Sequence, residues 1–228
     1  MRFFDVHTHI LPNIDDGSAS VEESKQMIEV LKNQGVTDII LTPHFYHYEM
    51  TLDHFLEKRN EAFSKIEEIF KDLGITPHIG AEVYLINTLF RYDDISELCI
   101  DKGQYILVEL PFDEKDSQKV LKKLHKLSAN YSVKPILAHI EKYPAFFNTR
   151  FLTEVNKLGY VTQIDVDSLK NPFKKRKIIK FIEKGLIQLA GTDCHNLKER
   201  KPDLEVLKKT VPDIMAEFLF NNSDITFV

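Results

Sequence analysis

Seven short apolar segments alternate with longer polar segments, and this alternation restricts the fold more than any other feature of the sequence. The apolar segments are FFDVH (3–7), TDIILTPH (37–44), PHIGAEVY (77–84), YILVEL (105–110), KPILAHI (134–140), YVTQID (160–165) and IQLAGTD (187–193). Their near-continuous hydrophobicity is typical of parallel strands that are covered on both faces. Helical periodicity fills the sequence between them, so we predict an α/β fold in which helical crossovers connect seven parallel strands.

Start and stop signals mark several of the helices. The predicted helices include SVEESKQMIEVLKNQG (20–35), FLEKRNEAFSKIEEIFKDLG (55–74) and NPFKKRKIIKFIEKG (171–185). Ser20 and Glu23 form a capping box at the start of the first. Asn171 and Pro172 occupy the N-cap and the first helical position of the last. Glycines stand where a helix must turn back into a strand, at Gly35, Gly74, Gly159 and Gly185.

Two arrangements of seven parallel strands fit this pattern: a closed barrel and an open, doubly wound sheet. No glycine-rich phosphate loop follows the first strand, which argues against a dinucleotide-binding fold. No repeat, linker or low-complexity segment interrupts the chain. We therefore predict a single domain over residues 1–228.

Composition excludes some functions and favours one compartment. The net charge of −5 argues against nucleic-acid binding, which needs a dominant basic face. The densest basic stretch, KKRK (174–177), is expected on the solvated face of a helix, with a docking patch for an acidic partner as the alternative. The first residues run directly into a strand without a basic and apolar leader, and no apolar run approaches the roughly 20 residues that span a bilayer. Two cysteines, Cys99 and Cys194, are too few for a disulfide framework, so we expect a cytoplasmic protein.

Histidine and acidic residues stand at the carboxyl ends of six predicted strands. They are His7 and His9, His44, Glu82, Glu109, His139, and Asp193 with His195. In parallel barrels the carboxyl ends of the strands meet on one face, so residues distant in sequence would share one pocket. Alternate side chains of a strand point to the same side, which lets the pairs His7/His9 and Asp193/His195 each grip one ion. Imidazole and carboxylate groups in this density predict a site for divalent metals such as zinc, manganese or iron.

The remaining histidines need no metal to explain them. An isolated histidine near a core is usually a hydrogen-bonded structural residue, which is our expectation for His47, His54, His78 and His125. The same explanation fails for the strand-end set, because each member would need its own buried partner. Glu82 and Glu109 follow apolar runs, where an unpaired carboxylate is costly and metal coordination removes that cost.

The motifs resemble those of a known superfamily. DVHTHILPNIDDG, TPH, GAEVY, VEL, AHIEKY and TDCHN are similar to the signatures of the polymerase and histidinol phosphatase (PHP) superfamily. The resemblance covers nearly the whole chain and implies a distorted (β/α)7 TIM-like barrel with about three divalent metal ions per chain. It implies manganese first, with iron, zinc, cobalt or magnesium as alternatives. The implied ligands are His7, His9, Asp16, His44, Glu82, Glu109, His139, Asp193 and His195.

Within that superfamily the chain looks most like the metal-dependent protein-tyrosine phosphatases of capsule and exopolysaccharide operons. The resemblance implies hydrolysis of phosphotyrosine on the tail of a bacterial tyrosine autokinase. It also implies two phosphate-binding cations, at Lys142 and Arg200. Lys142 departs from the arginine usual in the family, which keeps the charge and loses the bidentate fork. Asp165 stands where a neutral residue is expected, and either a supporting role at the site or a purely structural role fits it.

Three other functions compete with this hypothesis. A small-molecule phosphatase acting on histidinol phosphate is the alternative within the superfamily. A partner that binds the kinase tail without turnover would not need nine metal-coordinating groups. Cys194 and Arg200 also satisfy the C-x5-R pattern of thiol-based tyrosine phosphatases, but the intervening HNLKE has no glycine to form a loop of converging N–H groups. We therefore predict that the Cys194 side chain points away from the pocket and packs as a small hydrophobe.

Overall fold

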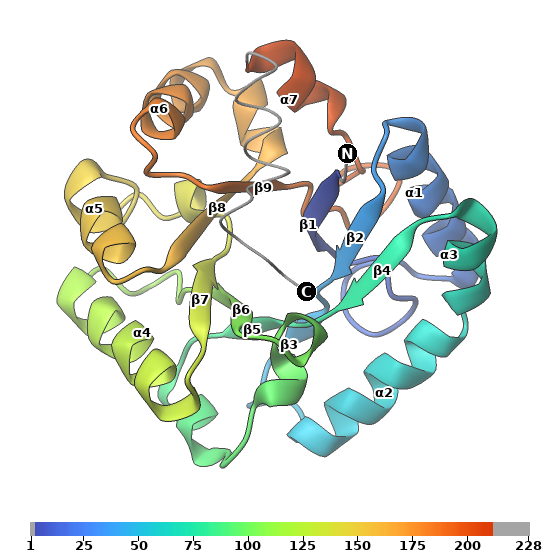
Figure 1. The fold of residues 1–228 in the computed structure, drawn as a ribbon, viewed down its shortest axis with the longest axis horizontal. Coiled ribbons are helices and arrows are strands. Elements are labelled where there is room, and N and C mark those ends of the chain that lie inside the picture. The colour runs from blue at the N-terminus through green and yellow to red at the C-terminus, as the bar shows by residue number, and fades with distance from the viewer. Residues whose placement is uncertain (1–2, 212–228) are drawn as a thin grey trace.

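The computed structural model describes residues 3–211 as an α/β barrel, so residues 1–2 and 212–228 of the predicted domain lie outside the described part. Its strands form a ring and its helices lie around the outside of that ring (Figure 1). The strands are β1 (Phe4–Thr8), β2 (Asp38–Leu41), β3 (His44–Phe45), β4 (Thr76–Ile79), β5 (Glu82–Tyr84), β6 (Tyr105–Glu109), β7 (Lys134–Leu137), β8 (Val161–Asp165) and β9 (Leu189–Gly191).

The strands pair in parallel throughout, in the orders β1-β2-β4 and β3-β5-β6-β7-β8-β9. The segment after β9 meets the end of β1 and closes the ring. There the Asp193 N–H donates to the His7 carbonyl at 2.8 Å, and the His9 N–H donates to the Cys194 carbonyl at 2.9 Å. The predicted (β/α)7 barrel is confirmed, and the open-sheet alternative is wrong for this chain.

Two of the seven predicted strands are each divided in two. Segment 37–44 forms β2 and β3, and segment 77–84 forms β4 and β5. Pro43 interrupts the first because it has no N–H to give to a ladder. The pairing nevertheless continues across the gap, where the Gly80 N–H donates to the Leu41 carbonyl at 2.9 Å and the Glu82 N–H to the Pro43 carbonyl at 3.0 Å. Within residues 3–211, nine short strands therefore occupy seven positions around the barrel.

Helices fill the crossovers as predicted, with one difference. The α-helices are α1 (Val21–Asn33), α2 (Leu52–Ser64), α3 (Glu67–Leu73), α4 (Ser117–Tyr131), α5 (Thr149–Lys157), α6 (Pro172–Glu183) and α7 (Glu205–Thr210). Short 3-10 helices are η1 (Asn87–Arg91), η2 (Ser96–Leu98), η3 (Ile100–Lys102), η4 (Ile140–Lys142) and η5 (Val166–Lys170). The predicted single helix over 55–74 is two helices that meet at the fully buried Ile66. No proline or glycine marks this break, so the helical periodicity runs through it.

The expected N-cap residues are present, although the Glu23 carboxylate of the predicted capping box accepts from the Ala19 N–H and not from Ser20. The Ser20 hydroxyl accepts from the Glu23 N–H at 3.1 Å, and the Asn171 side chain accepts from the N–H groups of Phe173 and Lys174. All four predicted helix-ending glycines have positive φ, between 65° and 91°, a conformation that costs other residues a steric penalty. These local signals therefore fix where each crossover returns to the barrel.

A second hydrophobic cluster, separate from the main core, draws its members from strands on all sides of the ring. It contains Phe4, Val6, Ile40, Ile100, Tyr105, Leu107, Ile136, Ala138, Val161 and Leu189. Strands on opposite sides of the ring, such as β2 and β7, can meet only inside it, so this cluster fills the barrel interior. Alternation along β6 then turns Glu109 inward, two residues after Leu107, and alternation after β9 turns Asp193 inward, four residues after Leu189. The polar site therefore lies directly above the apolar interior.

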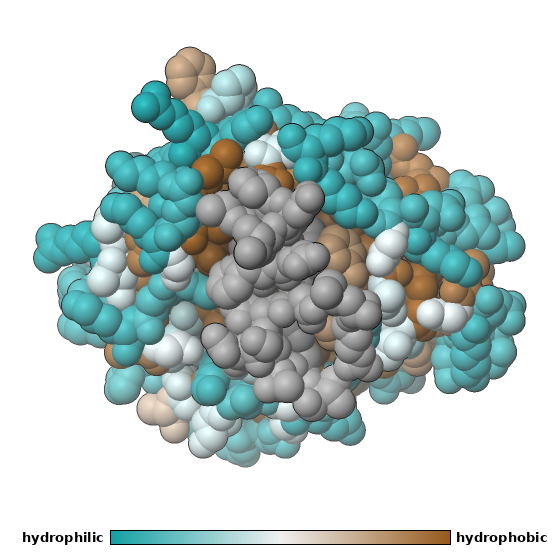
Figure 2. All heavy atoms as spheres, turned by 45° about the horizontal axis from the view of Figure 1, so that its top comes forward, coloured by the Kyte–Doolittle hydropathy of each residue, from teal (hydrophilic) through white to brown (hydrophobic). Residues whose placement is uncertain are grey.

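The outer surface is mainly polar. On the face that Figure 2 shows, hydrophilic side chains predominate and hydrophobic ones form separate patches between them. Residues 174–177 lie on α6 and are partly or fully exposed, as predicted for a solvated helix face. Within residues 3–211, no helix combines the length and the apolar character that a bilayer crossing requires.

Candidate metal centre

All nine predicted ligands converge at the carboxyl ends of the strands. The side chains come from β1 and the loop after it, β3, β5, β6, the turn after β7 and the segment after β9. Three overlapping groups have ligand atoms within 4.8 Å of one another: His9 with Asp16, His44 and His195; His7 with His9 and Glu82; and His44 with Glu82 and Glu109. The predicted convergence of distant residues is therefore confirmed.

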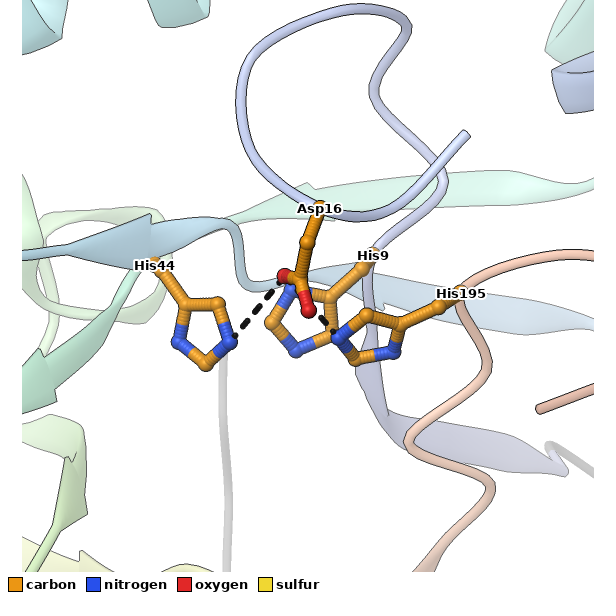
Figure 3. Close-up of side chains that lie close together, drawn as sticks. All are labelled: His9, Asp16, His44 and His195. Carbon is orange, nitrogen blue, oxygen red and sulfur yellow. Dashed lines mark ion pairs between the residues drawn. The ribbon is translucent and has the colours of Figure 1, made fainter. Parts of the chain in front are cut away.

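Asp16 approaches the cluster from the loop after β1 and faces three histidines at strand ends (Figure 3). Its Oδ1 lies 3.3 Å from His195 Nε2 and 3.5 Å from His44 Nε2. The neighbouring Asp15 has a different place. Its Oδ2 lies 2.8 Å from His9 Nδ1 and accepts a hydrogen bond from the His44 N–H at 2.9 Å. Asp16 thus faces the cluster directly, whereas Asp15 holds a histidine from behind.

Glu82 lies at the centre of the cluster and is fully buried. Its Oε2 lies 3.0 Å from His44 Nδ1, 3.1 Å from His7 Nε2 and 3.3 Å from His9 Nε2. Its Oε1 lies 2.9 Å from His139 Nε2. Burial opposes ionisation, but the surrounding histidines hold the pKa of Glu82 well below its usual range. One carboxylate therefore contacts four imidazoles.

The carboxylates and histidines of the cluster shift one another's pKa values. Burial disfavours the charged ring of His9, yet Asp15, Asp193 and Glu82 raise its pKa well above the usual value. Burial, with the charge of Glu82, raises the pKa of Glu109. The charged form of His9 is therefore stabilised by the carboxylates around it, whereas burial favours the neutral form of Glu109.

Several buried nitrogen and oxygen atoms of the cluster lie close to other polar atoms but make no hydrogen bond of good geometry among residues 3–211. They are His44 Nδ1, His139 Nδ1, Asp193 Oδ1 and His195 Nε2. In addition, His7 Nε2 lies 3.1 Å from His9 Nε2, an arrangement in which the two nitrogens share at most one proton. Buried polar atoms are costly without partners, and a cation would satisfy them. The residues present therefore fit divalent metal ions.

Two residues that the sequence analysis missed orient the histidines. Besides Asp15, Gln163 on β8 lies behind the cluster, with its Oε1 3.3 Å from His7 Nδ1 and accepting from the His139 N–H at 2.8 Å. A partner on one ring nitrogen fixes the tautomer and leaves the other nitrogen for a metal. Alternation on β8 could have indicated Gln163, because it lies two residues after the inward-facing Val161.

The backbone is constrained where these side chains converge. His139 and Asp193 both have positive φ, 31° and 51°, a region that is strained for residues other than glycine and is found at functional sites. At two glycines a Cβ would collide with a site histidine. It would lie 2.2 Å from the His9 carbonyl oxygen at Gly17 and 2.7 Å from His7 Cβ at Gly191. The loop carrying Asp16 and the end of β9 can therefore approach β1 only through glycine.

Lys142 and Arg200 lie at the rim and share one oxygen of Asp193. Lys142 Nζ donates to Asp193 Oδ2 at 2.7 Å, and an Arg200 guanidinium nitrogen lies 2.8 Å from the same oxygen. The other oxygen, Oδ1, lies 3.4 Å from His9 Nε2 and 3.5 Å from His7 Nε2. Burial opposes ionisation of Asp193, but these histidines and Lys142 keep its pKa well below the usual range. Asp193 therefore links the histidine cluster to the cationic rim.

Asp165 contacts Lys142 and lies 3.1 Å from its Nζ. Burial raises the pKa of Asp165 even though Lys142 opposes the shift. Burial and the charge of Asp165 also raise the pKa of Glu141, to about 7. Lys142 thus lies between the carboxylates of Asp165 and Asp193. Asp165, the acid that was not expected on β8, therefore pairs with the lysine that was not expected at position 142.

The thiol of Cys194 faces away from the cluster, as predicted. It is fully buried in the main hydrophobic core, and burial raises its pKa well above the usual value. Arg200, the other half of the C-x5-R match, pairs with Asp193 and Asp16. A buried, protonated thiol is a poor nucleophile, so the geometry does not fit thiol-based chemistry.

The other histidines divide into two kinds. His47 bonds to the Tyr84 carbonyl and Thr88, and His78 bonds to Asp38 and Asp101, as expected of structural residues. His54 and His125 instead lie on the exposed surfaces of α2 and α4, so the expectation of a core role was wrong for these two.

Known proteins with a similar sequence are named as tyrosine-protein phosphatases. The chain is 29% identical over 203 residues to the putative tyrosine-protein phosphatase CapC of Staphylococcus aureus, covering 86% of this chain and 78% of that protein. It is 28% identical over 216 residues to the tyrosine-protein phosphatase CpsB of Streptococcus pneumoniae, covering 88% and 86%. These similarities extend over most of both chains.

Solved structures agree with the fold. One match belongs to a set of crystal structures of YwqE from Bacillus subtilis and CpsB from Streptococcus pneumoniae, which are described as unique metal-dependent tyrosine phosphatases. Its TM-score is 0.78 at 25% sequence identity. It covers 97% of this chain and 92% of that one. The phosphotriesterase homology protein of Escherichia coli matches with a TM-score of 0.61 at 12% identity over 97% and 96% of the two chains, which shows the shared fold alone. Since the family model for capsular polysaccharide synthesis proteins CpsB/CapC matches residues 3–225, the chain that builds this cluster belongs to the CpsB/CapC family.

Proposed function

We propose that this protein is a metal-dependent phosphatase that hydrolyses phosphotyrosine in proteins. The observation that carries the proposal is the position of Asp193, with one oxygen toward His7 and His9 and the other bound to Lys142 and Arg200. Ligands for cations and donors for a phosphoryl group thereby stand side by side. The tyrosine-phosphatase relatives support the choice of phosphotyrosine over other phosphomonoesters.

Each group at the site has a proposed role. The proposed metal ligands are His7, His9, Asp16, His44, Glu82, Glu109, His139, Asp193 and His195, which would hold about three ions, with manganese as the first choice. Divalent cations bound there would acidify water and neutralise phosphoryl oxygens. Lys142 and Arg200 bind and orient the phosphate from the rim, and Asp15 and Gln163 hold the histidine tautomers. The charged groups of Lys142 and Arg200 are held in place before the substrate binds, which lowers the cost of reorganisation in the transition state.

The physiological setting is part of the proposal. Family membership in capsular polysaccharide synthesis supports a tyrosine-phosphorylated tail of a bacterial autokinase as the partner. The cytoplasm is the proposed compartment, and the two free cysteines, Cys99 and Cys194, are compatible with it. Residues 1–228 are proposed to form one phosphatase domain.

The test compares two substrates on the same metal-loaded protein. A phosphotyrosine peptide and histidinol phosphate are assayed for kcat/KM before chelation, after chelation and after manganese is restored. We expect manganese-dependent hydrolysis with a clear preference for the peptide. Preference for histidinol phosphate would replace the proposed substrate class, and full activity in metal-free protein would refute the proposed chemistry.

A further inference from the structure

An exposed aromatic ring stands beside the metal centre without a role in the proposed chemistry. Phe112 follows β6 three residues after Glu109, and 59% of its surface is exposed. Its ring stacks on Tyr143, with 4.9 Å between centroids and 21° between planes. The same ring lies 6.3 Å from that of His139 at an angle of 11°. A large apolar side chain is therefore held in solvent within stacking distance of a proposed metal ligand.

The rings of Phe112, Tyr143 and His139 form a nearly parallel set. The Tyr143 and His139 centroids are 5.7 Å apart at 27°. Tyr143 is buried, and its hydroxyl accepts a hydrogen bond from the Leu110 N–H at 3.1 Å, which fixes the orientation of this ring. Because its neighbours are fixed, Phe112 presents an aromatic face in a constant place.

A cavity of about 390 Å³ opens against this aromatic set. Its lining residues are Phe112, Glu114, Lys115, Tyr143, Pro144 and Ala145. Aromatic rings and small apolar groups form most of its wall. The two charged lining residues, Glu114 and Lys115, are adjacent in the sequence. Its volume falls in the range of small-molecule sites, roughly 300–1,000 Å³.

A second cavity at the centre has a different chemistry. It measures about 320 Å³ and is lined by Ile14, Asp15, Asp16, His44, Tyr46, Glu49 and Met50. Asp15, Asp16 and Glu49 contribute carboxylates to this wall, and Asp16 and His44 are proposed metal ligands, so this cavity suits cations. The apolar cavity beside Phe112 instead suits an uncharged ring.

We propose that the cavity between Phe112, Tyr143 and Pro144 binds the aromatic ring of the substrate, and that Phe112 makes the enzyme prefer aryl over alkyl phosphate monoesters. The inference rests on the proposed phosphatase function. A phosphotyrosine places its ring one oxygen away from phosphorus, so a phosphate at the metal centre brings the ring to the wall next to His139. Aromatic side chains gain from offset stacking beyond simple burial, and an alkyl phosphate has no such group.

The test measures selectivity in Phe112→Ala, Phe112→Tyr and a control. Phenyl phosphate and glycerol 3-phosphate serve as the aryl and alkyl substrates, with metal content measured for each protein. We expect Phe112→Ala to raise KM for phenyl phosphate roughly tenfold and leave kcat/KM for glycerol 3-phosphate unchanged. Phe112→Tyr should retain the selectivity of the wild type because it keeps the ring. Phe173→Ala removes an even more exposed ring, 89% exposed on α6, and should change neither value.

The outcomes separate this inference from the function on which it rests. Equal losses on both substrates in Phe112→Ala would show that the ring only supports His139 and would overturn the inference. Unchanged selectivity in an active protein would overturn it as well, leaving the phosphatase function intact. A metal-loaded wild type that fails to hydrolyse aryl phosphates would overturn both.

Discussion

Lys142 donates a hydrogen bond of 2.7 Å to the oxygen of Asp193 that faces away from His7 and His9. A single carboxylate thus fixes the position of a rim cation relative to the histidine cluster. Arg200 binds the same oxygen, so the two cations are held close together. This arrangement preorganises two positive groups for a phosphoryl group that binds between them and the cluster.

Replacement of Lys142 should damage catalysis according to the charge that remains. Lys142→Ala is expected to lower kcat/KM on a phosphotyrosine peptide by about 10²-fold, because it removes a cation that stabilises transition-state charge. Lys142→Arg should keep or improve activity, since the planar fork suits phosphate. Steady-state kinetics with metal analysis of each variant provides the measurement. Wild-type kinetics in Lys142→Ala would remove the residue from the phosphate site.

Metal removal should affect stability as well as activity. The central Glu82 contacts four imidazoles, and the protein leaves buried donor atoms without hydrogen bonds. Ions that bind only the folded state stabilise it by mass action, so chelation should lower Tm and manganese should restore it. Glu82→Gln should lose at least one ion per chain and most activity. Metal content and Tm are measured with and without chelator. A Tm that does not change on chelation would contradict the proposed metal centre.

Cys194 and His195 are neighbours with opposite expected effects. Cys194→Ser should keep most activity and lose about 1 kcal/mol of unfolding free energy, because the side chain packs in the core. His195→Ala should lower activity by orders of magnitude, since it removes a proposed ligand. Both variants are assayed on one phosphotyrosine peptide after urea unfolding has established their stability. An inactive Cys194→Ser with intact metal content would favour thiol chemistry.

The two glycines packed against β1 should be coupled to metal content. Gly17→Ala would place its Cβ 2.2 Å from the His9 carbonyl oxygen, so the loop bearing Asp16 must move. We expect a loss of roughly 2 kcal/mol in stability together with reduced metal binding. Gly74→Ala is the matched control. That residue has φ of 65° and nothing within 4 Å of an added Cβ, so its cost of about 1 kcal/mol should leave metal content unchanged. Equal metal content in both variants would show that the packing of Gly17 does not affect metal binding.

His78 should make stability depend on pH at a place distant from the metal centre. Burial lowers its pKa, but hydrogen bonds to Asp101 and Asp38 outweigh burial and raise it above the usual value. Because the pKa of His78 is higher in the folded state, its protonated form stabilises the folded protein. This stabilisation is complete below the unfolded-state pKa of about 6.5 and is lost as the pH rises through the folded-state pKa. The difference in unfolding free energy between wild type and His78→Gln should therefore shrink between pH 6 and pH 9. A constant difference over this range would show that the charge of His78 contributes nothing.

The fold followed from the sequence wherever a local signal carried the information. Continuous apolar runs and caps such as Ser20 and Asn171 define strands and helix starts through neighbouring residues alone. The division of segment 37–44 depends on Pro43, a visible signal, whereas the break at Ile66 has no local signal. Tertiary packing decides that boundary, since Ile66 is fully buried at the point where two helices meet.

The convergence of the site was predictable because the barrel brings strand ends together regardless of the sequence between them. Alternation indicates that Gln163 faces inward, but its role and that of Asp15 depend on distances to His7 and His9 that only the folded chain defines. The pairing of Lys142 with Asp165 was hidden for the same reason. Both residues departed from the family pattern, and only their 3.1 Å separation connects the two departures.

The closure of the barrel has a consequence for biosynthesis. Four of the nine proposed ligands, His7, His9, Asp193 and His195, flank the seam where the first and last strands meet. A nascent chain emerges from its amino end, so its first two ligands leave the ribosome about 185 residues before their partners across the seam. We therefore expect an incomplete chain to capture metal poorly, because binding energy becomes available only with the folded site. Acquisition of the ions would then follow the closure of the barrel seam.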